Sequence, residues 1–526
     1  MSSTTSNKGI AGVIAASSLG TLIEWYDFYI FGSLAVIIST KFFPSGNPTA
    51  ALLSTLATFA AGFVVRPFGA LFFGRLGDIV GRKYTFLVTL VLMGLSTFLI
   101  GCIPSYEKIG FVAPILVLFL RLLQGLALGG EYGGAATYVA EHSPEHKRGF
   151  WTSWIQTTAT VGLFLSLLVI VTTKASMSKE AFADWGWRVP FWISIIMVVI
   201  SIFIRMRMKE SPLFQKAKDE GKTSTNPLKE SFGNKLNFKF VLLALFGATM
   251  GQGVVWYTGQ FYALTFIQTT LNVDITQASN ILMIALAMGT PFFIVFGALS
   301  DKIGRKWIML LGMLIALLSY RTIYSKMYDS GSVKAKTEVV ANTKVTSSSM
   351  ADAKIAGDSV RTTVTNKAYT DGTMYVETKK VHVHADITKA DEKVDTKVDK
   401  VTTLDRGSFW SLVWLVFIQV LFVTMVYGPI AAFLVEMFPI RIRYTSMSLP
   451  YHIGNGIFGG LLPTIALFLA TKAGQANEVA AKVNGALPYD KPYLEGLWYP
   501  IIIAGVCFVI GALYINNKSK TVTDSL

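Results

Sequence analysis

The sequence predicts an all-α polytopic membrane protein, with twelve transmembrane helices in two halves of six and a polar insert after the ninth helix. Composition is the first indication: 52% of the 526 residues are hydrophobic and only 15% are charged, whereas a soluble chain carries charge on about a quarter of its residues. The apolar residues also fall in runs of about 20, the length of a helix that crosses a bilayer core of about 30 Å. Finally, a pair of motifs recurs in both halves of the chain.

Twelve apolar runs are the expected spans. The first is too long for the core of a signal peptide, so we expect it to be retained as a helix. The long first and fourth runs are expected to include interfacial turns, and a re-entrant or interfacial helix is the alternative for any single run. Many runs are rich in Gly, Ala, Ser and Thr, which allow close helix packing in lipid. In order, the spans are expected at 12–40, 50–73, 84–103, 111–140, 150–173, 188–208, 239–267, 278–299, 307–324, 408–435, 446–471 and 496–515.

Two motifs repeat between the halves. Gly74–Lys83 and Gly297–Lys306 share G-x-L-x-D-x-x-G-R-K, while Glu141 and Glu436 each open E-x-x-P-x-x-x-R. The first pair lies 223 residues apart (74 to 297) and the second 295 residues apart (141 to 436), so the second half contains about 72 extra residues. Without that excess, the chain reads as two six-span halves related by duplication.

The extra residues lie between Ser325 and Arg406, where apolar runs give way to Thr, Val, Lys and Asp. Segments such as TMYVETKKVHVHADI alternate as strands do, and TDGT suits a turn. This segment is therefore expected to be either a small β module or a flexible loop. The expected division of the chain is 1–208 as the first six-helix half, 209–238 as a cytoplasmic linker, 239–324 with 407–526 as the second half, and 325–406 as an extracytoplasmic polar insert.

The formal charge of +15 and the pI of about 9.5 would suit nucleic-acid binding in a soluble protein. Here the basic residues lie in loops between spans, and the cytoplasmic loops of membrane proteins collect Lys and Arg. We therefore expect a multi-pass inner-membrane protein without a nucleic-acid partner, whose motif loops, linker and both termini are cytoplasmic. The two cysteines, Cys102 and Cys507, imply neither a disulfide framework nor a metal site.

These features resemble the major facilitator superfamily: twelve spans in two halves, the G-x-L-x-D-x-x-G-R-K loop in each half, and a basic linker. The resemblance narrows to the metabolite:proton symporter family, whose pattern is similar to IEWYDF in the first span, VRPFG (Val65–Gly69) in the second and RLLQGLALGGEYGG (Arg121–Gly134) in the fourth. GWRVPF (Gly186–Phe191) and KESP (Lys209–Pro212) fit the same pattern, and only the insert departs from it. The family carries shikimate, 2-oxoglutarate, citrate, proline and betaines, so the resemblance implies proton-coupled uptake of a small polar metabolite without choosing one.

Two carboxylates stand inside the first apolar run. Glu24 and Asp27 are three residues apart, on one helix face, and about 18 to 22 Å along the span. A carboxylate there costs about 3 kcal/mol or more unless it is paired, hydrated or protonated. Both are therefore proton-coupling candidates, and fixed ion pairs that orient helices are the alternative.

Other charged residues lie in the second and fourth spans. Arg121 lies at a depth similar to that of Asp27, and the resemblance places the first and fourth helices along a central cavity. Arg121, with Gln124, is therefore a substrate-binding candidate, and its fork either holds a substrate carboxylate or pairs with Asp27. Arg66 fits the family pattern or a helix-packing role equally. Glu131 lies among glycines that allow close packing, so it is a proton-coupling candidate or a structural partner of Arg66.

The seventh span supplies neutral polar groups. Gln252, Trp256, Tyr257 and Gln260 are substrate-binding candidates, because Gln260 follows Trp256 by four residues and one face can present both a ring and an amide. Aromatic walls with few polar groups suit a small metabolite. Helix packing with interfacial anchoring is the alternative. Tyr262 belongs to the same cluster, and weaker candidates elsewhere are Tyr427, His452 and Asn455.

The motif loops are expected to gate the transporter rather than to bind its substrate. Glycines allow tight turns there, and Asp78 and Asp301 can accept hydrogen bonds from arginines or a helix end. The resemblance implies that such pairs latch the cytoplasmic side and release during alternating access, with loop stabilisation as the alternative. The expected gating residues are Asp78, Arg82, Arg148, Asp301, Arg305 and Arg443.

Together these features predict a secondary active transporter that couples uptake of a small organic acid or zwitterion to protons. There is no G-x-x-x-x-G-K-[ST] loop, which disfavours ATP-driven transport, and no nucleophile–base pair or metal set is visible, since His382 and His384 alone are a weak signal. We therefore expect no enzyme activity, cofactor or metal, and a monomer whose partners are the metabolite, protons and lipid. The alternatives are a facilitator or antiporter of the superfamily, or a membrane sensor that uses the insert.

Overall fold

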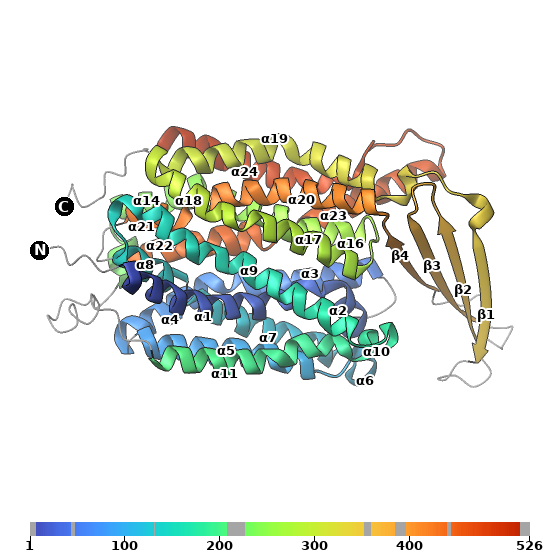
Figure 1. The fold of residues 1–526 in the computed structure, drawn as a ribbon, viewed down its shortest axis with the longest axis horizontal. Coiled ribbons are helices and arrows are strands. Elements are labelled where there is room, and N and C mark those ends of the chain that lie inside the picture. The colour runs from blue at the N-terminus through green and yellow to red at the C-terminus, as the bar shows by residue number, and fades with distance from the viewer. Residues whose placement is uncertain are drawn as a thin grey trace, which may run out of the picture. The chain divides into compact units, whose positions relative to one another are not determined.

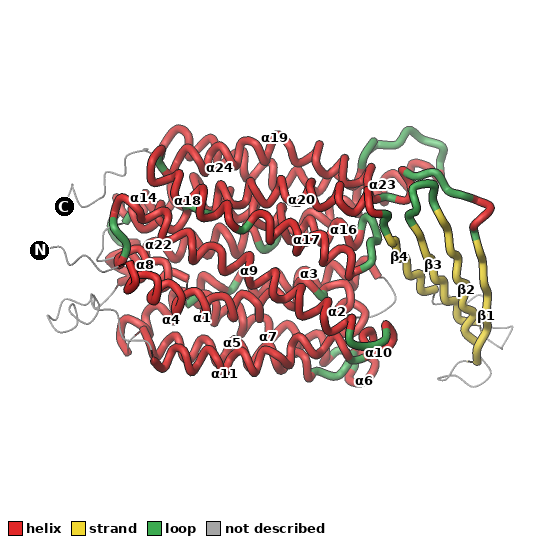
Figure 2. Tube along the Cα trace, viewed as in Figure 1, coloured by secondary structure: helices red, strands yellow, loops and turns green. Residues whose placement is uncertain are grey.

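The computed structural model describes residues 7–43, 48–80, 82–130, 132–207, 227–351, 359–383, 396–438 and 443–515 as long helices and one sheet (Figure 1). The chain divides into two compact units. The first comprises Met1–Tyr262, Met283–Arg321 and Phe417–Leu526, and the second comprises Ala263–Leu282 and Thr322–Val416. Helices α17, α19 and α20 contribute residues to both units. The strands lie together in one stretch of the chain, and most of the other described residues are helical (Figure 2).

The helices of the N-terminal half are α1 Asn7–Ser33, α2 Ala35–Phe42, α3 Pro48–Val64, α4 Arg66–Val80, α5 Arg82–Cys102, α6 Tyr106–Ile109, α7 Val112–Gly129, α8 Tyr132–His142, α9 Arg148–Ala175, α10 Lys179–Asp184 and α11 Val189–Arg207. The later helices are α13 Pro227–Phe232, α14 Lys235–Ala244, α15 Met250–Tyr257, α16 Ala263–Thr269, α17 Ile275–Gly289, α18 Pro291–Ile303, α19 Arg305–Gly331, α20 Arg406–Tyr427, α21 Ile430–Met437, α22 Arg443–His452, α23 Leu462–Lys482 and α24 Trp498–Tyr514.

The predicted apolar runs correspond to helices. Ten helical stretches of the described residues are long and apolar enough to cross a membrane, or eleven if the bent pair Ser18–Ser33 and Ala35–Phe42 is one span. That pair is bent by 63°, which confirms a turn within the long first run. Leu87–Cys102 of α5 is a shorter apolar helix. A polytopic helical membrane protein is therefore confirmed, whereas the number twelve stays a prediction.

Helices of the first unit touch backbone to backbone where glycines face a neighbour. Gly125 and Gly129 lie on one face of α7, four residues apart. A Cβ atom on Gly125 would overlap the carbonyl oxygen of Gly62, and a Cβ atom on Gly129 would overlap the carbonyl oxygen of Arg66. A Cβ atom on Gly69 would likewise overlap the backbone of α7. Small residues let helix backbones touch in lipid, where packing rather than burial from water drives association. This glycine seam fixes α7 against α3 and α4.

The second unit contains a four-stranded antiparallel sheet in the order β1-β2-β3-β4. In register, Val364 lies opposite Thr346 on one side and Thr378 on the other. The turn predicted at TDGT is confirmed, because Gly372 has a φ of 92° and its N–H donates to the carbonyl of Tyr369. The strands are β1 Lys344–Ala351, β2 Ser359–Ala368, β3 Met374–Val383 and β4 Thr396–Thr403.

The sheet favours the β alternative for the polar segment, whereas the boundaries given to the domains and the status of 325–406 as an insert stay predictions. The helix before it is longer than the expected ninth span. α19 continues to Gly331, because Tyr324 and Met327 remain fully buried and extend the apolar face beyond the run that the sequence marks.

Hydrogen bonds attach β4 to the loop after α16 within the second unit. The Thr402 N–H donates to the carbonyl of Asn272 at 2.7 Å, and the Asp274 N–H donates to the carbonyl of Thr402 at 2.9 Å. The Gln277 side chain exchanges two hydrogen bonds with the backbone of Leu404, at 3.1 and 2.8 Å. Backbone groups at the base of the sheet are thereby satisfied by the helix ends.

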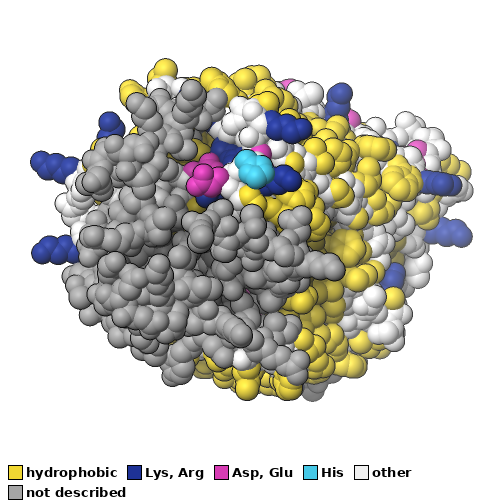
Figure 3. Space-filling model, turned by 60° about the vertical axis from the view of Figure 1, so that its left-hand side comes forward, with side chains coloured by type: hydrophobic (Ala, Val, Ile, Leu, Met, Phe, Trp, Pro, Cys, Tyr) yellow, Lys and Arg dark blue, Asp and Glu magenta, His cyan; other side chains and the backbone are white. Residues whose placement is uncertain are grey.

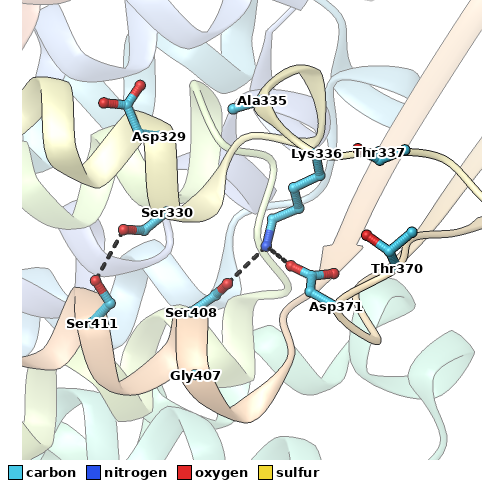
Figure 4. A pocket seen from close by; sticks show the side chains of 10 residues that line it. All are labelled: Asp329, Ser330, Ala335, Lys336, Thr337, Thr370, Asp371, Gly407, Ser408 and Ser411. Atoms are coloured by element: carbon cyan, nitrogen blue, oxygen red, sulfur yellow. Dashed lines mark hydrogen bonds and ion pairs between the residues drawn. The ribbon is translucent and has the colours of Figure 1, made fainter.

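A charged clamp lies at the start of α20. Figure 4 shows the Lys336 ammonium bonded to the Asp371 carboxylate and donating to Ser408 Oγ at 2.7 Å. The ammonium also lies 3.5 Å from Asp405 Oδ1. Asp405 also caps α20 by accepting from the N–H groups of Gly407 (2.7 Å) and Ser408 (3.2 Å). This clamp, made of Lys336, Asp371, Asp405 and Ser408, borders an open pocket of about 460 Å³.

The glycine seam predicts that Gly125→Ala destabilises the protein strongly. The new methyl group would overlap the Gly62 carbonyl oxygen, and overpacking of this kind costs about 1–3 kcal/mol or more. Thermal unfolding in detergent should therefore shift downward by several degrees. Gly505→Ala is the matched control, because a Cβ atom there meets nothing within 4 Å. Equal melting temperatures for the two variants would show that the seam is not tight.

Acid is expected to weaken the clamp between pH 4 and pH 2. Partial burial raises the pKa of Asp405, but hydrogen bonds from Ser408 and Gly407 and the nearby Lys336 outweigh it and bring the pKa to about 2, from an ordinary 3.8. A lowered folded-state pKa stabilises the fold above the unfolded pKa, and this stability is lost as the pH falls through the folded value.

Pepsin cleavage in the second unit, measured at pH 4 and pH 2, tests this. The wild type should become several-fold more susceptible on acidification relative to Asp405→Asn, whose amide does not titrate. An equal rise in pepsin susceptibility for the two proteins would mean that ionised Asp405 does not stabilise the clamp.

Candidate substrate and proton site

Aromatic side chains of the first and seventh spans meet inside the first unit. Trp25 stacks on Tyr29 with ring centroids 5.1 Å apart, and Tyr29 stacks on Trp256 of α15 at 5.5 Å. All three residues are at most 5% exposed. Trp25 and Tyr29 are one turn apart on α1, so their rings align. The stack therefore joins a helix of the N-terminal half to a helix of the C-terminal half.

Two π-helical stretches, Leu245–Thr249 and Thr258–Tyr262, interrupt the seventh span. A π turn widens the helix and changes the direction of the side chains that follow. Trp256 stacks on Tyr29 of α1, whereas Gln260 Nε2 donates to Thr160 Oγ1 of α9 at 3.4 Å. Both side chains therefore contact helices of the N-terminal half, and the interpretation that one face presents the ring and the amide stays a prediction. The four-residue spacing holds for a regular α-helix, and the second π stretch begins between them.

The other two candidates in this span have different surroundings. Gln252 exchanges amide hydrogen bonds with Asn455 at 3.0 and 2.9 Å, which commits it to packing against the stretch Ile453–Gly459. Tyr257 packs edge-on against Phe63 of α3, with ring centroids 5.1 Å apart. Trp256 and Tyr257 therefore present ring surface to the N-terminal half, and Gln252 ties helices of the C-terminal half together.

Arg121 is fully buried and its guanidinium is committed to the protein. Its Nη1 donates to the carbonyl of Phe28 at 3.3 Å and to Gln124 Oε1 at 2.6 Å, and its Nη2 donates to the carbonyl of Phe59 at 3.3 Å. Gln124 Nε2 donates onward to Thr97 Oγ1 at 2.6 Å. Arg121 and Gln124 thus join α1, α3, α5 and α7, and the alternative pairing of Arg121 with Asp27 does not occur in this structure.

Asp27 is fully buried, and neither carboxylate oxygen has a hydrogen-bond partner among the described residues. It faces α5, because a Cβ atom on Gly94 would lie 3.3 Å from Asp27 Oδ2. Glu24, one turn earlier, is 2% exposed. Glu131 lies outside the described residues. Of the three proton candidates, Asp27 is therefore the one that the structure shows without a compensating partner.

Arg66, for which the sequence leaves a family role and a helix-packing role open, lies where α3 ends and α4 begins. It is the first residue of α4 and is fully buried, and Nε, Nη1 and Nη2 lack hydrogen-bond partners among the described residues. Its guanidinium carbon lies 4.0 Å from the ring centre of Phe63, 4.5 Å from that of Phe28 and 5.0 Å from that of Trp25. The signal in the sequence was an Arg-Pro pair inside an apolar run, which breaks the helix at mid-span and leaves the arginine there.

A second group of contacts between the two halves is made by tyrosine side chains. The Tyr132 ring of α8 stacks on Tyr451 of α22 at 3.5 Å. Tyr132 Oη accepts from Gln156 at 2.5 Å, and the Tyr427 and Tyr451 hydroxyls lie 2.7 Å apart. His452 is fully buried, and both of its ring nitrogens lack partners among the described residues. Tyr427 and His452 therefore lie in the interior, as the sequence suggested, and Tyr132 was missed.

At one end of the bundle, four charged side chains join the halves. The Arg305 guanidinium forms two hydrogen bonds to Glu436 at 3.3 and 2.9 Å and lies 2.6 Å from Asp301 Oδ1, while Arg148 Nη1 lies 3.6 Å from Glu436. Asp301 accepts from the N–H groups of Gly149 and Phe150, both at 2.8 Å, at the start of α9. We call this set, Arg148, Asp301, Arg305 and Glu436, the latch. On the end face, acidic, basic and histidine side chains gather beside an apolar flank (Figure 3).

Three predicted gating residues cannot be placed in the latch. The side chains of Asp78, Arg82 and Arg443 lie outside the described part of the structure, although the backbone of their helices is described. Glu436, known from the sequence only as part of a repeated motif, is the centre of the latch. Lys306 of the second motif instead donates to the carbonyls of Ala512 and Ile515 at 2.8 and 2.6 Å, and so caps α24.

Two sets of membrane-spanning helices that meet through aromatic rings and ion pairs are the architecture of a membrane transporter. The chain belongs to the family described as sugar (and other) transporter, which it matches over residues 13–343. It is 38% identical over 307 residues to the proline/betaine transporter of Escherichia coli (strain K12), a match that covers 57% of this chain and 61% of that protein. The chain thus spans about three fifths of the length of that relative.

A second relative is the alpha-ketoglutarate permease of the same organism, 37% identical over 320 residues, 61% of this chain and 72% of the permease. A solved major facilitator superfamily structure, the proton:xylose symporter XylE, matches with a TM-score of 0.60 at 16% identity, over 97% of each chain. The resemblance to the superfamily is therefore confirmed, and the relatives are membrane transporters rather than enzymes.

The latch predicts that Glu436→Gln weakens the contact between the halves at this end. With Cys102→Ser as background, a cysteine placed at the fully buried Ser153, beside Gly297 of α18, should react with a maleimide several-fold faster. Glu495→Gln is the matched control, because Glu495 pairs with Arg321 at 3.2 Å within the C-terminal half. Equal rates in both variants would show that the latch does not hold this end closed.

Proposed function

We propose that this chain is a secondary active transporter that couples uptake of a small organic carboxylate, a free acid or a zwitterion, to protons by alternating access. The inner membrane is its location, with the latch and both termini on the cytoplasmic side. The observation that carries the proposal is a pair of fully buried ionisable groups without hydrogen-bond partners among the described residues, the acid Asp27 and the base Arg66.

Asp27 is the proton carrier in this proposal. An uncompensated charge at this depth costs about 3 kcal/mol or more, and a group retained at that cost is a functional candidate. The neutral carboxyl avoids most of this cost, so proton uptake and release change the stability of the packing between α1 and α5. Two conformations that solvate Asp27 differently would therefore bind the proton with different affinities, which is the requirement for coupling.

Arg66 is the substrate anchor. Both relatives are named for substrates that carry a carboxylate, and a guanidinium offers a carboxylate two parallel hydrogen bonds. The rings of Phe28, Phe63 and Trp25 hold the guanidinium in place and exclude water. A charge-assisted bond in such surroundings is stronger than in water.

Alternating access then requires contacts that open in turn on the two sides. With the latch formed, substrate and proton enter from the opposite side. Separation of Arg148 from Glu436, and of Asp301 from the start of α9, would open the latch side for release. Duplicated halves around a site at mid-membrane suit such rocking.

A facilitator or antiporter of the same superfamily is the second candidate. It would need Asp27 to keep its charge in a fixed pair, and the absence of a hydrogen-bond partner for Asp27 among the described residues favours symport.

Asp27→Asn in proteoliposomes tests the coupling. Uptake of labelled betaine, proline and 2-oxoglutarate would be measured with an inward proton gradient, with and without a protonophore. The wild type should accumulate at least one compound, and the variant should lose about 10-fold or more of that accumulation. Exchange of labelled for unlabelled compound, which needs no net proton movement, should persist in the variant.

The control is Asp184→Asn, at an exposed position, and it should behave as the wild type. Gradient-driven accumulation by Asp27→Asn equal to that of the wild type would remove Asp27 from the mechanism. Wild-type uptake that ignores the gradient would favour the facilitator.

A further inference from the structure

The open pocket beside the clamp has no part in the proposed function. It measures about 460 Å³ and belongs to the second unit, where the end of α19, the turn before β3 and the start of α20 meet. Pockets of this size hold small molecules. Apart from Ala335 and Gly407, its described lining residues all carry charged or hydroxyl side chains. Its ligand is therefore expected to be polar or charged.

The clamp shows how an ammonium group is held on one side of this pocket. The Lys336 ammonium bonds to the Asp371 carboxylate and donates to Ser408 Oγ at 2.7 Å. The Lys336 side chain is only 8% exposed, so these acceptors replace most of the water around its charge. A carboxylate with a neighbouring hydroxyl is thus the arrangement that satisfies ammonium N–H groups here.

The other side of the pocket presents the same two kinds of group without a basic side chain bonded to them. Figure 4 shows Asp329, Ser330 and Ser411 on one side and Lys336 and Asp371 on the other. The Asp329 carboxylate has no ion-pair partner among the described residues. The Ser330 and Ser411 hydroxyls lie 2.9 Å apart and share one hydrogen bond, so their remaining lone pairs can accept from a ligand.

The charges of the pocket and the clamp do not balance. The Lys336 ammonium serves two carboxylates, because it also lies 3.5 Å from Asp405 Oδ1. With Asp329, three carboxylates face one ammonium, which leaves a net formal charge of −2 (1 − 3). Asp371 accepts from Lys336 and from the Thr373 N–H, yet its side chain stays 34% exposed. Since a carboxylate offers about four acceptor positions, Asp371 can accept from a further donor.

We infer that this pocket is a binding site for a small aliphatic diamine. One ammonium group of the ligand lies between Asp329 and the hydroxyls of Ser330 and Ser411. The second bonds to Asp371 and to the Thr370 hydroxyl beside it, and the two positive charges neutralise the pocket. The bound ligand connects α19 and α20 to the turn before β3. The site is separate from the proposed substrate site and does not depend on the proposed function.

Other cations fit this pocket less well. The described residues contain no group of three His, Cys, Asp or Glu side chains that could hold a metal ion, and Ca²⁺ takes about six to eight oxygen ligands. A quaternary ammonium has no N–H to donate and is recognised by ring faces, whereas no aromatic residue is among the described residues that line this pocket. An ammonium with three N–H donors matches the hydroxyls and carboxylates that are present.

Competition against labelled 1,4-diaminobutane, measured by equilibrium dialysis with the purified full chain, tests the ligand class. 1,4-Butanediol has the same length without charge, and the N-permethylated diamine keeps both charges without N–H donors. Each should compete at least about 10-fold more weakly than unlabelled diamine, because each lacks the charge-assisted hydrogen bonds. Binding should also weaken as the salt concentration rises, since the pocket is open to solvent.

A variant tests the place of binding. Asp329→Asn should weaken diamine binding about 10-fold, because it keeps the shape of the side chain and removes the charge. Asp490→Asn is the matched control, since Asp490 is an exposed acid in the loop between α23 and α24, outside the pocket. Both variants should keep the melting temperature that the wild type has without ligand, so that a loss of binding is not a loss of folding.

Each contrary result overturns a definite part of the inference. No saturable binding of 1,4-diaminobutane at millimolar concentration would overturn the site, and unchanged affinity in Asp329→Asn would place the bound diamine elsewhere. Equal competition by the permethylated diamine would overturn the role of the hydroxyl and carboxylate acceptors. Stronger competition by Mg²⁺ or Ca²⁺ than by the diamine would make this a metal site. None of these results bears on proton-driven uptake, which is measured separately.

Discussion

A charge buried in a lipid bilayer has to be compensated, and the arrangement of this bundle follows from how each buried charge meets that requirement. Arg121 does so permanently, through two backbone carbonyls and Gln124. Lys306 does so at the end of α24. Arg66 and Asp27 have no such partner among the described residues. The first two therefore stabilise the fold, and the proposed function uses the other two, Arg66 for a carboxylate and Asp27 for a proton.

The two halves meet through contacts of different chemical character. At one end the latch uses ion pairs and a helix N-terminus, whereas in the interior Tyr29 stacks on Trp256. The four latch side chains are each at most 16% exposed, so the loss of one partner leaves a poorly solvated charge. Ring surfaces inside the bundle are instead stable only when they are covered, by each other or by a ligand. A substrate that takes the place of ring–ring contacts can therefore influence whether the latch stays formed.

Much of the fold could be predicted, because hydrophobicity alone marks the helices, and the bend in the long first run follows from its length. The site could be predicted only in part. The sequence offers Trp256 and Tyr257 as candidates, but the π-helical stretches of the seventh span depend on packing that no local spacing reveals. Arg66 and Arg121 look alike in sequence, since each is an arginine in an apolar run. Which of them is satisfied depends on backbone carbonyls and on Gln124, which the fold brings together.

In the stretch Asp27, Phe28 and Tyr29, three neighbouring residues connect the proposed proton site to the proposed substrate site. Successive residues of a helix point about 100° apart, so three neighbours reach three different surroundings. Asp27 faces α5, Phe28 covers both guanidinium groups at 4.5 and 4.1 Å, and Tyr29 stacks on Trp256. A small rotation or shift of α1 when Asp27 gains or loses its proton would move all three contacts together, because they share one rigid helix. In the proposed function, this shared helix is the mechanical route from the acidic residue to the substrate.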